Sequence, residues 1–178
     1  MLAKPPGRKK RFQPDYIADS VNDINFKFLQ KHGIKAVLID LDGTVVSRGT
    51  YEVDAKLTNY LKKQTIKIYI ATNRPKSRDL KNLKESLHAT GVIHPVGIFM
   101  KPSSQYYKQA ASLHHLKTSE VAMIGDKYLQ DIYGANLVGL TTIVVRKLGE
   151  PKGFFDAQLS RIERKRTDKL AKHYTPVK

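Results

Sequence analysis

The stretch "VLIDLDGTVV" at residues 37–46 places two acids at the end of an apolar run. Its first residues are apolar and partly β-branched, as in a strand that is buried on both faces. Asp40 and Asp42 follow, and Gly43 and Thr44 come directly after them. Ionised carboxylates that leave water cost several kcal/mol each unless a partner compensates them. The stretch therefore predicts a buried strand that delivers two carboxylates to a cation, to a proton-transfer task, or to both.

Short β-branched runs alternate with longer amphipathic stretches along the rest of the chain. We expect strands over residues 35–40, 66–72, 96–100, 120–125 and 140–145, and helices over residues 54–64, 76–89, 103–115 and 129–138. The connections between the strands are long enough for right-handed crossovers. The pattern predicts an α/β fold with a doubly wound, Rossmann-like parallel sheet.

The length and composition bound the class of protein. The chain has 178 residues, of which 40% are apolar, and it has no cysteine. It contains no apolar run long enough for a membrane-spanning helix, and its basic start lacks the apolar segment of a signal peptide. We expect a basic N-terminal segment with a helix over residues 1–34, a catalytic core over 35–150 and a basic amphipathic tail over 151–178. A cytoplasmic protein that can associate with the inner membrane face fits these features.

The charge is strongly positive and lies mainly at the two ends. Lys and Arg number 32 against 16 Asp and Glu, which gives a net charge of +16. Residues 1–36 carry a net +5 and residues 146–178 a net +6, so the two ends hold +11 of this charge. Such ends indicate an anionic partner, either nucleic acid or an acidic membrane. The alternative is that the charge only keeps the protein soluble.

The tail has the spacing of an amphipathic helix. Phe154, Phe155, Leu159 and Ile162 recur at near-helical intervals, and the polar side is rich in Lys and Arg. We expect the apolar stripe to pack on the domain. The alternative is that this basic amphipathic stretch lies on an anionic membrane.

Polar residues follow successive predicted strands. They are Asp40, Asp42, Thr72, Asn73, Lys101, Asp126 and Asp131. Alone, each such residue is more often a cap or a structural group. In doubly wound sheets, however, ligands bind outside the carboxyl ends of the strands, where these side chains would converge. The set therefore predicts one functional site at this edge of the sheet.

Four of these segments resemble the signature motifs of the haloacid dehalogenase-like (HAD) phosphohydrolase superfamily. The segments are "DLDGT" at 40–44, "ATN" at 71–73, "KP" at 101–102 and "GDKYLQD" at 125–131, in the order that the family has. The chain as a whole resembles the capless subgroup (HAD-IIIA) that includes YqeG-type proteins and the mitochondrial phosphatidylglycerophosphate phosphatase. The resemblance implies a phosphatase that forms an aspartyl-phosphate intermediate.

The resemblance also implies roles for the motif residues. Asp40 would be the nucleophile and Asp42 the general acid and base. Thr72 and Lys101 would complete the catalytic group by stabilising the transferring phosphoryl group. The substrate-binding residues would be Gly43, Thr44 and Asn73.

A bound Mg²⁺ is the cofactor that this chemistry implies. Its ligands would be Asp40, the backbone carbonyl of Asp42, and Asp126. Asp131 has three alternatives: it touches the metal through water, it orients Lys101, or it lies in the first turn of the following helix.

The spacing of the motifs leaves no room for a large cap domain. Thr44 and Thr72 are 28 positions apart, Thr72 and Lys101 are 29 apart, and each interval already holds a predicted helix and strand. An open site suits large substrates. We expect a Mg²⁺-dependent phosphomonoester hydrolase that acts on a large or membrane-borne anionic substrate such as phosphatidylglycerophosphate. One alternative is a phosphatase for nucleic-acid ends or phosphoproteins, and another is a nucleic-acid-binding or scaffolding module with a vestigial site.

Overall fold

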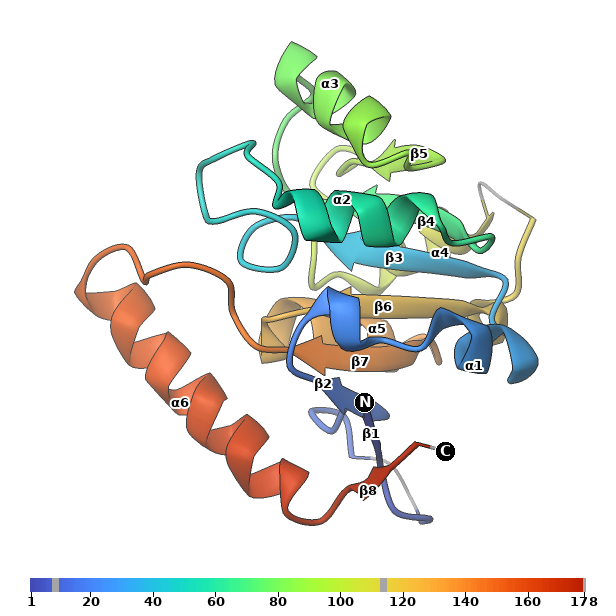
Figure 1. Ribbon diagram of the computed structural model, residues 1–178, viewed down its shortest axis with the longest axis vertical. Helices are drawn as coiled ribbons and strands as arrows, with labels where there is room; N and C mark the ends of the chain where they lie inside the picture. The colour runs from blue at the N-terminus through green and yellow to red at the C-terminus, as the bar shows by residue number, and fades with distance from the viewer. Residues whose placement is uncertain (8–9, 113–114, 178) are drawn as a thin grey trace.

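The computed structural model describes residues 1–7, 10–112 and 115–177. In this part of the chain, eight strands form one sheet in the order β5-β4-β3-β6-β7-β2-β1-β8 (Figure 1). The strands are β1 (Leu2–Ala3), β2 (Tyr16–Ala18), β3 (Ala36–Asp40), β4 (Lys67–Ala71), β5 (Gly91–Ile93), β6 (Val121–Gly125), β7 (Thr141–Val145) and β8 (Thr175–Pro176). The six strands from β5 to β2 are parallel, and β1 is antiparallel to both of its neighbours.

Helices cover both faces of the sheet. They are α1 (Phe26–Lys31), α2 (Ala55–Lys62), α3 (Arg78–Ser86), α4 (Ser104–Ser112), α5 (Gly134–Asn136) and α6 (Phe154–Ala171), with a π-helical turn at Tyr128–Tyr133 and 3₁₀ turns at Val21–Asp23 and Thr118–Glu120. Apolar residues of α1, α2 and α3 share one core cluster with alternate residues of β3, while α4 and α5 share another with the residues in between. The prediction of a doubly wound α/β fold is therefore confirmed.

Side-chain caps mark where the first helices begin. The carboxylate of Asp54 accepts hydrogen bonds from backbone N–H groups in the first turn of α2. The hydroxyl of Ser77 accepts a hydrogen bond from a backbone N–H group in the first turn of α3. Such caps satisfy backbone donors that have no partner inside the helix. The helix predicted over residues 103–115 corresponds to α4, which ends at Ser112. Residues 113 and 114 of this prediction lie outside the described residues.

The predicted strand over residues 96–100 is wrong. The strand at this place is β5, several residues earlier, and it pairs with β4. Residues 96–100 instead form an exposed segment in which the side chain of Ile98 is 86% accessible. An apolar run alone does not distinguish a buried strand from a segment that meets solvent.

The two ends of the chain extend the same sheet. β2 pairs with β7, β1 pairs with β2, and β8 near the C-terminus pairs with β1. A third core cluster under these strands contains Ile17, Tyr128 and Tyr174, with Leu170 of α6 packed against it. The sequence analysis did not predict these short strands.

The expected packing of the tail is also wrong. α6 forms, but Phe154, Phe155, Leu159 and Ile162 all point away from the domain and are exposed. In Figure 1, α6 lies outside the carboxyl ends of β7 and β2. No helix in the described residues has the length and apolar character needed to cross a membrane.

Candidate active site

The site begins with a tight turn after β3. The N–H groups of Val45 and Val46 both donate to the carbonyl of Leu41, at 3.0 and 3.1 Å. Gly43 has a φ of +87°, and a Cβ on it would lie 2.6 Å from the Oδ2 atom of Asp126. Only glycine allows both this left-handed backbone and this close approach. The turn therefore brings the loop after β3 against the end of β6.

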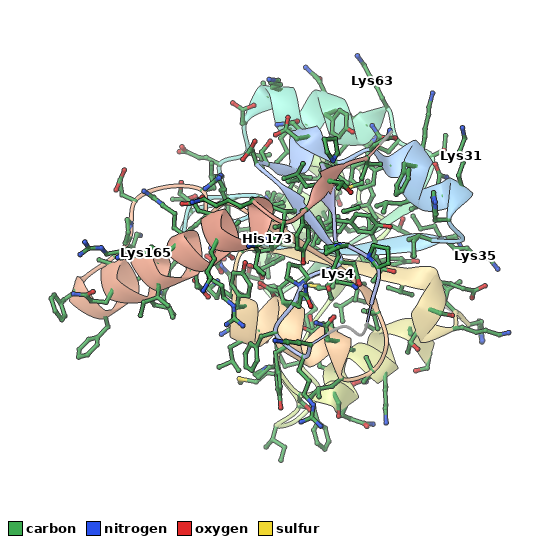
Figure 2. The ribbon with its side chains drawn as sticks, turned by 90° about the horizontal axis from the view of Figure 1, so that it is seen from below. Lys4, Lys31, Lys35, Lys63, Lys165 and His173 are labelled. Atoms are coloured by element: carbon green, nitrogen blue, oxygen red, sulfur yellow. The ribbon has the colours of Figure 1, made fainter. Side chains whose placement is uncertain are left out.

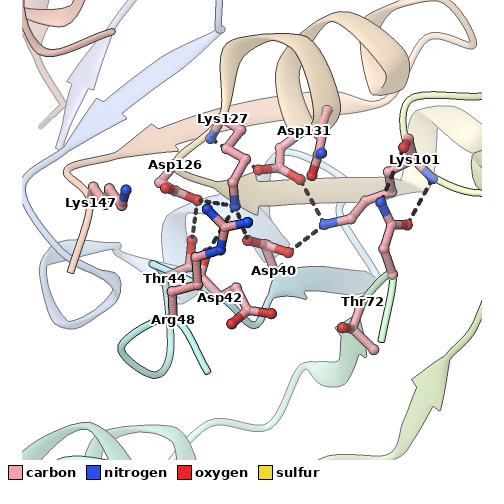
Figure 3. A network of polar contacts seen from close by, with 12 residues as sticks. Asp40, Asp42, Thr44, Arg48, Thr72, Lys101, Asp126, Lys127, Asp131 and Lys147 are labelled. Atoms are coloured by element: carbon pink, nitrogen blue, oxygen red, sulfur yellow. Dashed lines mark hydrogen bonds and ion pairs between the residues drawn. The ribbon is translucent and has the colours of Figure 1, made fainter. Parts of the chain in front are cut away.

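Three buried carboxylates converge at this edge. Asp40 ends β3, Asp126 follows β6, and Asp131 lies in the π-helical turn, and one oxygen of each lies within 4.8 Å of the others (Figure 3). Gly125 makes room for this arrangement, because a Cβ at that position would lie 2.3 Å from a carboxylate oxygen of Asp131. Burial, together with the neighbouring carboxylates of Asp40 and Asp131, raises the pKa of Asp126 to about 8 against the opposing effect of Lys127.

Lys101 neutralises part of this charge. Its ammonium group is almost fully buried, donates to Asp40, and donates to Asp131 at 2.8 Å. Burial would lower the pKa of Lys101, but the charges of Asp131 and Asp40 raise it well above its ordinary value. Lys101 is therefore a fixed cation. Of the three alternatives for Asp131, two hold together, because it lies in the first turn of the following helical segment and contacts Lys101.

Asn73 holds the backbone of Lys101. Its side-chain amide donates to the carbonyl of Lys101 at 3.1 Å and its oxygen accepts from the N–H of Lys101 at 2.9 Å. Both ends of this side chain are therefore used to position the lysine. Its predicted contact with substrate remains a prediction.

A second ammonium group, that of Lys127, contacts the groups predicted to bind metal. It lies 3.0 Å from the backbone carbonyl of Asp42, 3.5 Å from Asp126 and 3.7 Å from Asp40. In Figure 3 it approaches the carboxylates from a different side than Lys101 does. The ammonium group thus marks a position where a cation meets three oxygen ligands.

These residues fit a divalent cation. The Oδ2 atoms of Asp40 and Asp126 are buried and accept no hydrogen bond from any described residue. Buried carboxylate oxygens that accept no hydrogen bond are costly, and carboxylate and carbonyl oxygens are the ligands that hard divalent cations prefer. The side chain of Lys127 is 19% exposed, so it can leave this position toward solvent.

Asp42 lies at the mouth of the site and is paired with Arg74. The guanidinium group donates to both carboxylate oxygens, at 2.9 and 2.5 Å, and the N–H of Gly49 donates to one of them at 3.1 Å. Burial would raise the pKa of Asp42, but these hydrogen bonds and the charge of Arg74 lower it below its ordinary value. Asp42 is therefore held ionised while this pair is intact.

The two predicted threonines lie at the same edge. The hydroxyl of Thr44 donates to Asp126 at 3.4 Å. The hydroxyl of Thr72, at the end of β4, accepts from the N–H of Arg74 at 3.0 Å. The structure thus brings all the predicted site residues to one edge, in two groups: the buried acids with Lys101, and the outer pair of Asp42 with Arg74.

Sequence reasoning missed Arg74 and Lys127. Both are charged residues that directly continue a motif, since Arg74 follows "ATN" and Lys127 follows "GD". Their position beside strand-end motifs was the signal that could have identified them.

A cavity of about 320 Å³ adjoins Asp126 and is bounded by Lys147, Ser160 and Glu163 among other residues. α6 therefore forms one wall of the space next to the acids.

Comparison with known proteins agrees with this geometry. A family model described as HAD-hydrolase-like matches residues 98–172. The probable phosphatase YqeG of Bacillus subtilis (strain 168) is 27% identical over 160 residues, which cover 88% of this chain and 90% of the relative.

Two solved structures have a similar fold. The HAD phosphatase from Thermococcus onnurineus has a TM-score of 0.53 at 21% identity, covering 68% of this chain and 90% of its own. A HAD-superfamily hydrolase of subfamily IA from Geobacter sulfurreducens has a TM-score of 0.52 at 16% identity, covering 66% of this chain and 92% of its own. In its fold, in its acidic site and in these relatives, the chain is similar to the haloacid dehalogenase-like hydrolases.

Proposed function

We propose that the protein is a Mg²⁺-dependent phosphomonoester hydrolase in which Asp40 is the nucleophile. The observation that carries this proposal is the set of oxygens around the ammonium group of Lys127. Asp40, Asp126 and the backbone carbonyl of Asp42 surround one cation position beside the predicted nucleophile. Mg²⁺ held by these three groups would offset the repulsion between an attacking carboxylate and an anionic phosphate.

In the first half of the reaction, a carboxylate oxygen of Asp40 attacks phosphorus and the bond to the alcohol oxygen breaks. Asp42 gives a proton to the leaving alcohol, and the phosphoryl group stays on Asp40 as an acyl phosphate. The buried ammonium group of Lys101 contacts Asp40 and would stabilise the charge that develops around the transferring group.

In the second half, Asp42 takes a proton from a water molecule, whose oxygen attacks phosphorus and breaks the bond between phosphorus and the Asp40 oxygen. This step releases inorganic phosphate and returns Asp40 to its carboxylate form. Arg74 lowers the pKa of Asp42 and so keeps it as a carboxylate, the form that can accept this proton. The acid role requires Arg74 to leave Asp42, and a bound phosphate offers the guanidinium group another bidentate partner.

The proposed substrate is large or membrane-borne, with phosphatidylglycerophosphate as the leading candidate for an enzyme that acts from the cytoplasm. The interval between Thr44 and Thr72 holds α2 and β4, and the interval between Thr72 and Lys101 holds α3 and β5. Neither interval contains a further folded domain that could close over a small metabolite. The cavity beside Asp126 offers space for part of a leaving alcohol.

The experiment is hydrolysis of p-nitrophenyl phosphate by the wild type and by Asp40→Asn, with Mg²⁺ and with EDTA. We expect Mg²⁺-dependent turnover in the wild type and a loss of at least about a thousandfold in the variant, because an amide cannot attack phosphorus. Circular dichroism checks that the variant is folded. Turnover like that of the wild type in Asp40→Asn, with contaminating phosphatase excluded, would remove Asp40 as the nucleophile.

A substrate panel then tests the class of substrate. It compares phosphatidylglycerophosphate in vesicles, end-phosphorylated oligonucleotides, a phosphopeptide and small sugar phosphates. The proposal expects the lipid to have the highest kcat/KM. A preference for oligonucleotides or phosphopeptides would favour the alternative phosphatase functions, and turnover of none of the substrates would favour a vestigial site.

A further inference from the structure

The exposed apolar side chains gather on the side of the molecule where the acidic site lies. Twelve large apolar side chains are exposed among the described residues, and all but Leu137 belong to segments that follow the carboxyl ends of strands. These segments contribute Tyr51 after β3, residues 96–100 after β5, Leu129 after β6 and residues 148–162 after β7. Because parallel strands end at the same edge, this distribution places apolar groups on the side of the molecule that holds the site. Gathered apolar exposure of this kind marks interaction surfaces.

α6 turns its polar side toward the domain. Lys147 donates to Asp156 at 2.8 Å and to Ser160 at 2.9 Å, and the N–H of Tyr128 donates to Glu163 at 3.0 Å. These contacts hold the helix through hydrogen bonds and ion pairs. An amphipathic helix on a soluble domain normally buries its apolar side, so this orientation is reversed.

The outward side of α6 combines aromatic, aliphatic and basic groups. Phe155 is 86% exposed, Phe154 71% and Ile162 63%. At 100° per residue, Lys165 and Lys169 lie between Phe154 and Ile162 in projection down the helix axis. Figure 2 shows Lys165 on the opposite side of the molecule from Lys31 and Lys63.

We infer that this outward side of α6, together with the exposed segment 96–100, docks on an anionic lipid bilayer with the acidic site turned toward it. This docking face matches a bilayer in two ways: its aromatic and aliphatic groups can enter the interface, and its lysines can pair with anionic headgroups. The apolar part alone would suit a protein partner, but the interspersed lysines favour a surface of dense negative charge.

Helix α6 joins the docking face to the site. The same helix lines the cavity beside Asp126, through Ser160 and Glu163 on its inner side. This inference deepens the proposed function and rests on it for the substrate, but the docking itself can be measured without any reaction.

The test is co-sedimentation of the full chain with vesicles of equimolar phosphatidylglycerol and phosphatidylcholine, with no substrate present. We expect the wild type to bind, and Phe154→Ser/Phe155→Ser to weaken the partition coefficient by at least about tenfold. Lys165→Gln/Lys169→Gln should weaken it by about tenfold at low salt, and the difference should shrink as salt rises.

Matched controls remove the same groups from elsewhere on the molecule. Leu137→Ser removes an apolar side chain that is 41% exposed and precedes the amino end of β7. Lys31→Gln/Lys63→Gln removes two positive charges on the far side. Both controls should bind vesicles as the wild type does, and all the variants should hydrolyse p-nitrophenyl phosphate at the wild-type rate.

Three results would overturn the inference. The first is that the wild type does not bind anionic vesicles, and the second is that the docking-face variants bind them like the wild type. The third is that the wild type is a dimer which Phe154→Ser/Phe155→Ser converts to monomer, because this face would then be an interface between copies. Vesicle binding without phosphatase activity would refute the proposed function and leave the docking intact. Phosphatase activity without vesicle binding would refute the docking and leave the proposed function intact.

Discussion

Replacing Asp126 by Asn should stabilise the metal-free protein while it abolishes activity. Asp126 is buried, and its pKa in the folded protein is raised to about 8 from the ordinary value of 3.8. The folded state therefore holds a proton on Asp126 more tightly than the unfolded chain does. By linkage, this group lowers the free energy of unfolding as the pH rises from about 4 to about 8.

The size of the effect follows from the two pKa values. At pH 7, about three pH units above the ordinary pKa of Asp, the linkage amounts to about 4 kcal/mol. The variant removes this cost, which already includes the attraction of Lys127, but changes the side chain that the hydroxyl of Thr44 contacts. We therefore expect a net stabilisation of about 2 to 4 kcal/mol at pH 7, or roughly 5 to 15 °C in Tm for a protein of this size.

Thermal unfolding in EDTA between pH 5.5 and pH 8 measures this effect. The difference in Tm between Asp126→Asn and the wild type should grow with pH, and Mg²⁺ should raise the Tm of the wild type alone. Glu85→Gln, which removes a carboxylate from an exposed position of α3, should follow the wild type. The reasoning is refuted if Asp126→Asn is less stable than the wild type in EDTA at pH 8, or if the difference does not change with pH.

Two further predictions concern the cations that the sequence analysis missed. Arg74→Met should shift the pH profile of kcat/KM to higher pH, because the guanidinium group holds the pKa of Asp42 below its ordinary value; an unchanged profile would separate Arg74 from that acid. Lys127→Met should lower the Mg²⁺ concentration for half-maximal activity by roughly fivefold, because a competing charge worth about 1 kcal/mol leaves the cation position; a higher requirement would mean that Lys127 assists metal binding.

The central fold could be predicted because its signals are local and redundant. β3, β4, β6 and β7 are apolar runs buried on both faces, and the connections between them leave few alternatives to a parallel sheet. The edge of the sheet was harder to predict. β1 and β8 have two residues each, too few for a period, and they form because each meets a partner that is distant in sequence.

The orientation of α6 was the second feature that was predicted wrongly. The spacing of Phe154, Phe155 and Ile162 correctly predicted a helix, but spacing does not say which side of a helix meets the domain. That choice depends on the bonds that Asp156 and Glu163 make with residues of the loop after β7 and of the segment after β6. For the same reason, "ATN" and "GDKYLQD" predicted a site without revealing that Arg74 pairs with Asp42 or that Lys127 contacts three oxygen groups.

The pairing of β8 with β1 has a mechanical consequence for α6. The helix is tied to β7 at its start and, through Tyr174 and β8, to the N-terminal strand at its end, where the N–H of Val177 donates to the carbonyl of Met1 at 3.2 Å. Rolling the helix to bury its phenyl rings would twist both ties and break this short ladder. The two ties therefore act together with the bonds of Asp156 and Glu163 to keep the apolar side outward, and cutting the chain before Thr175 would remove one of these restraints.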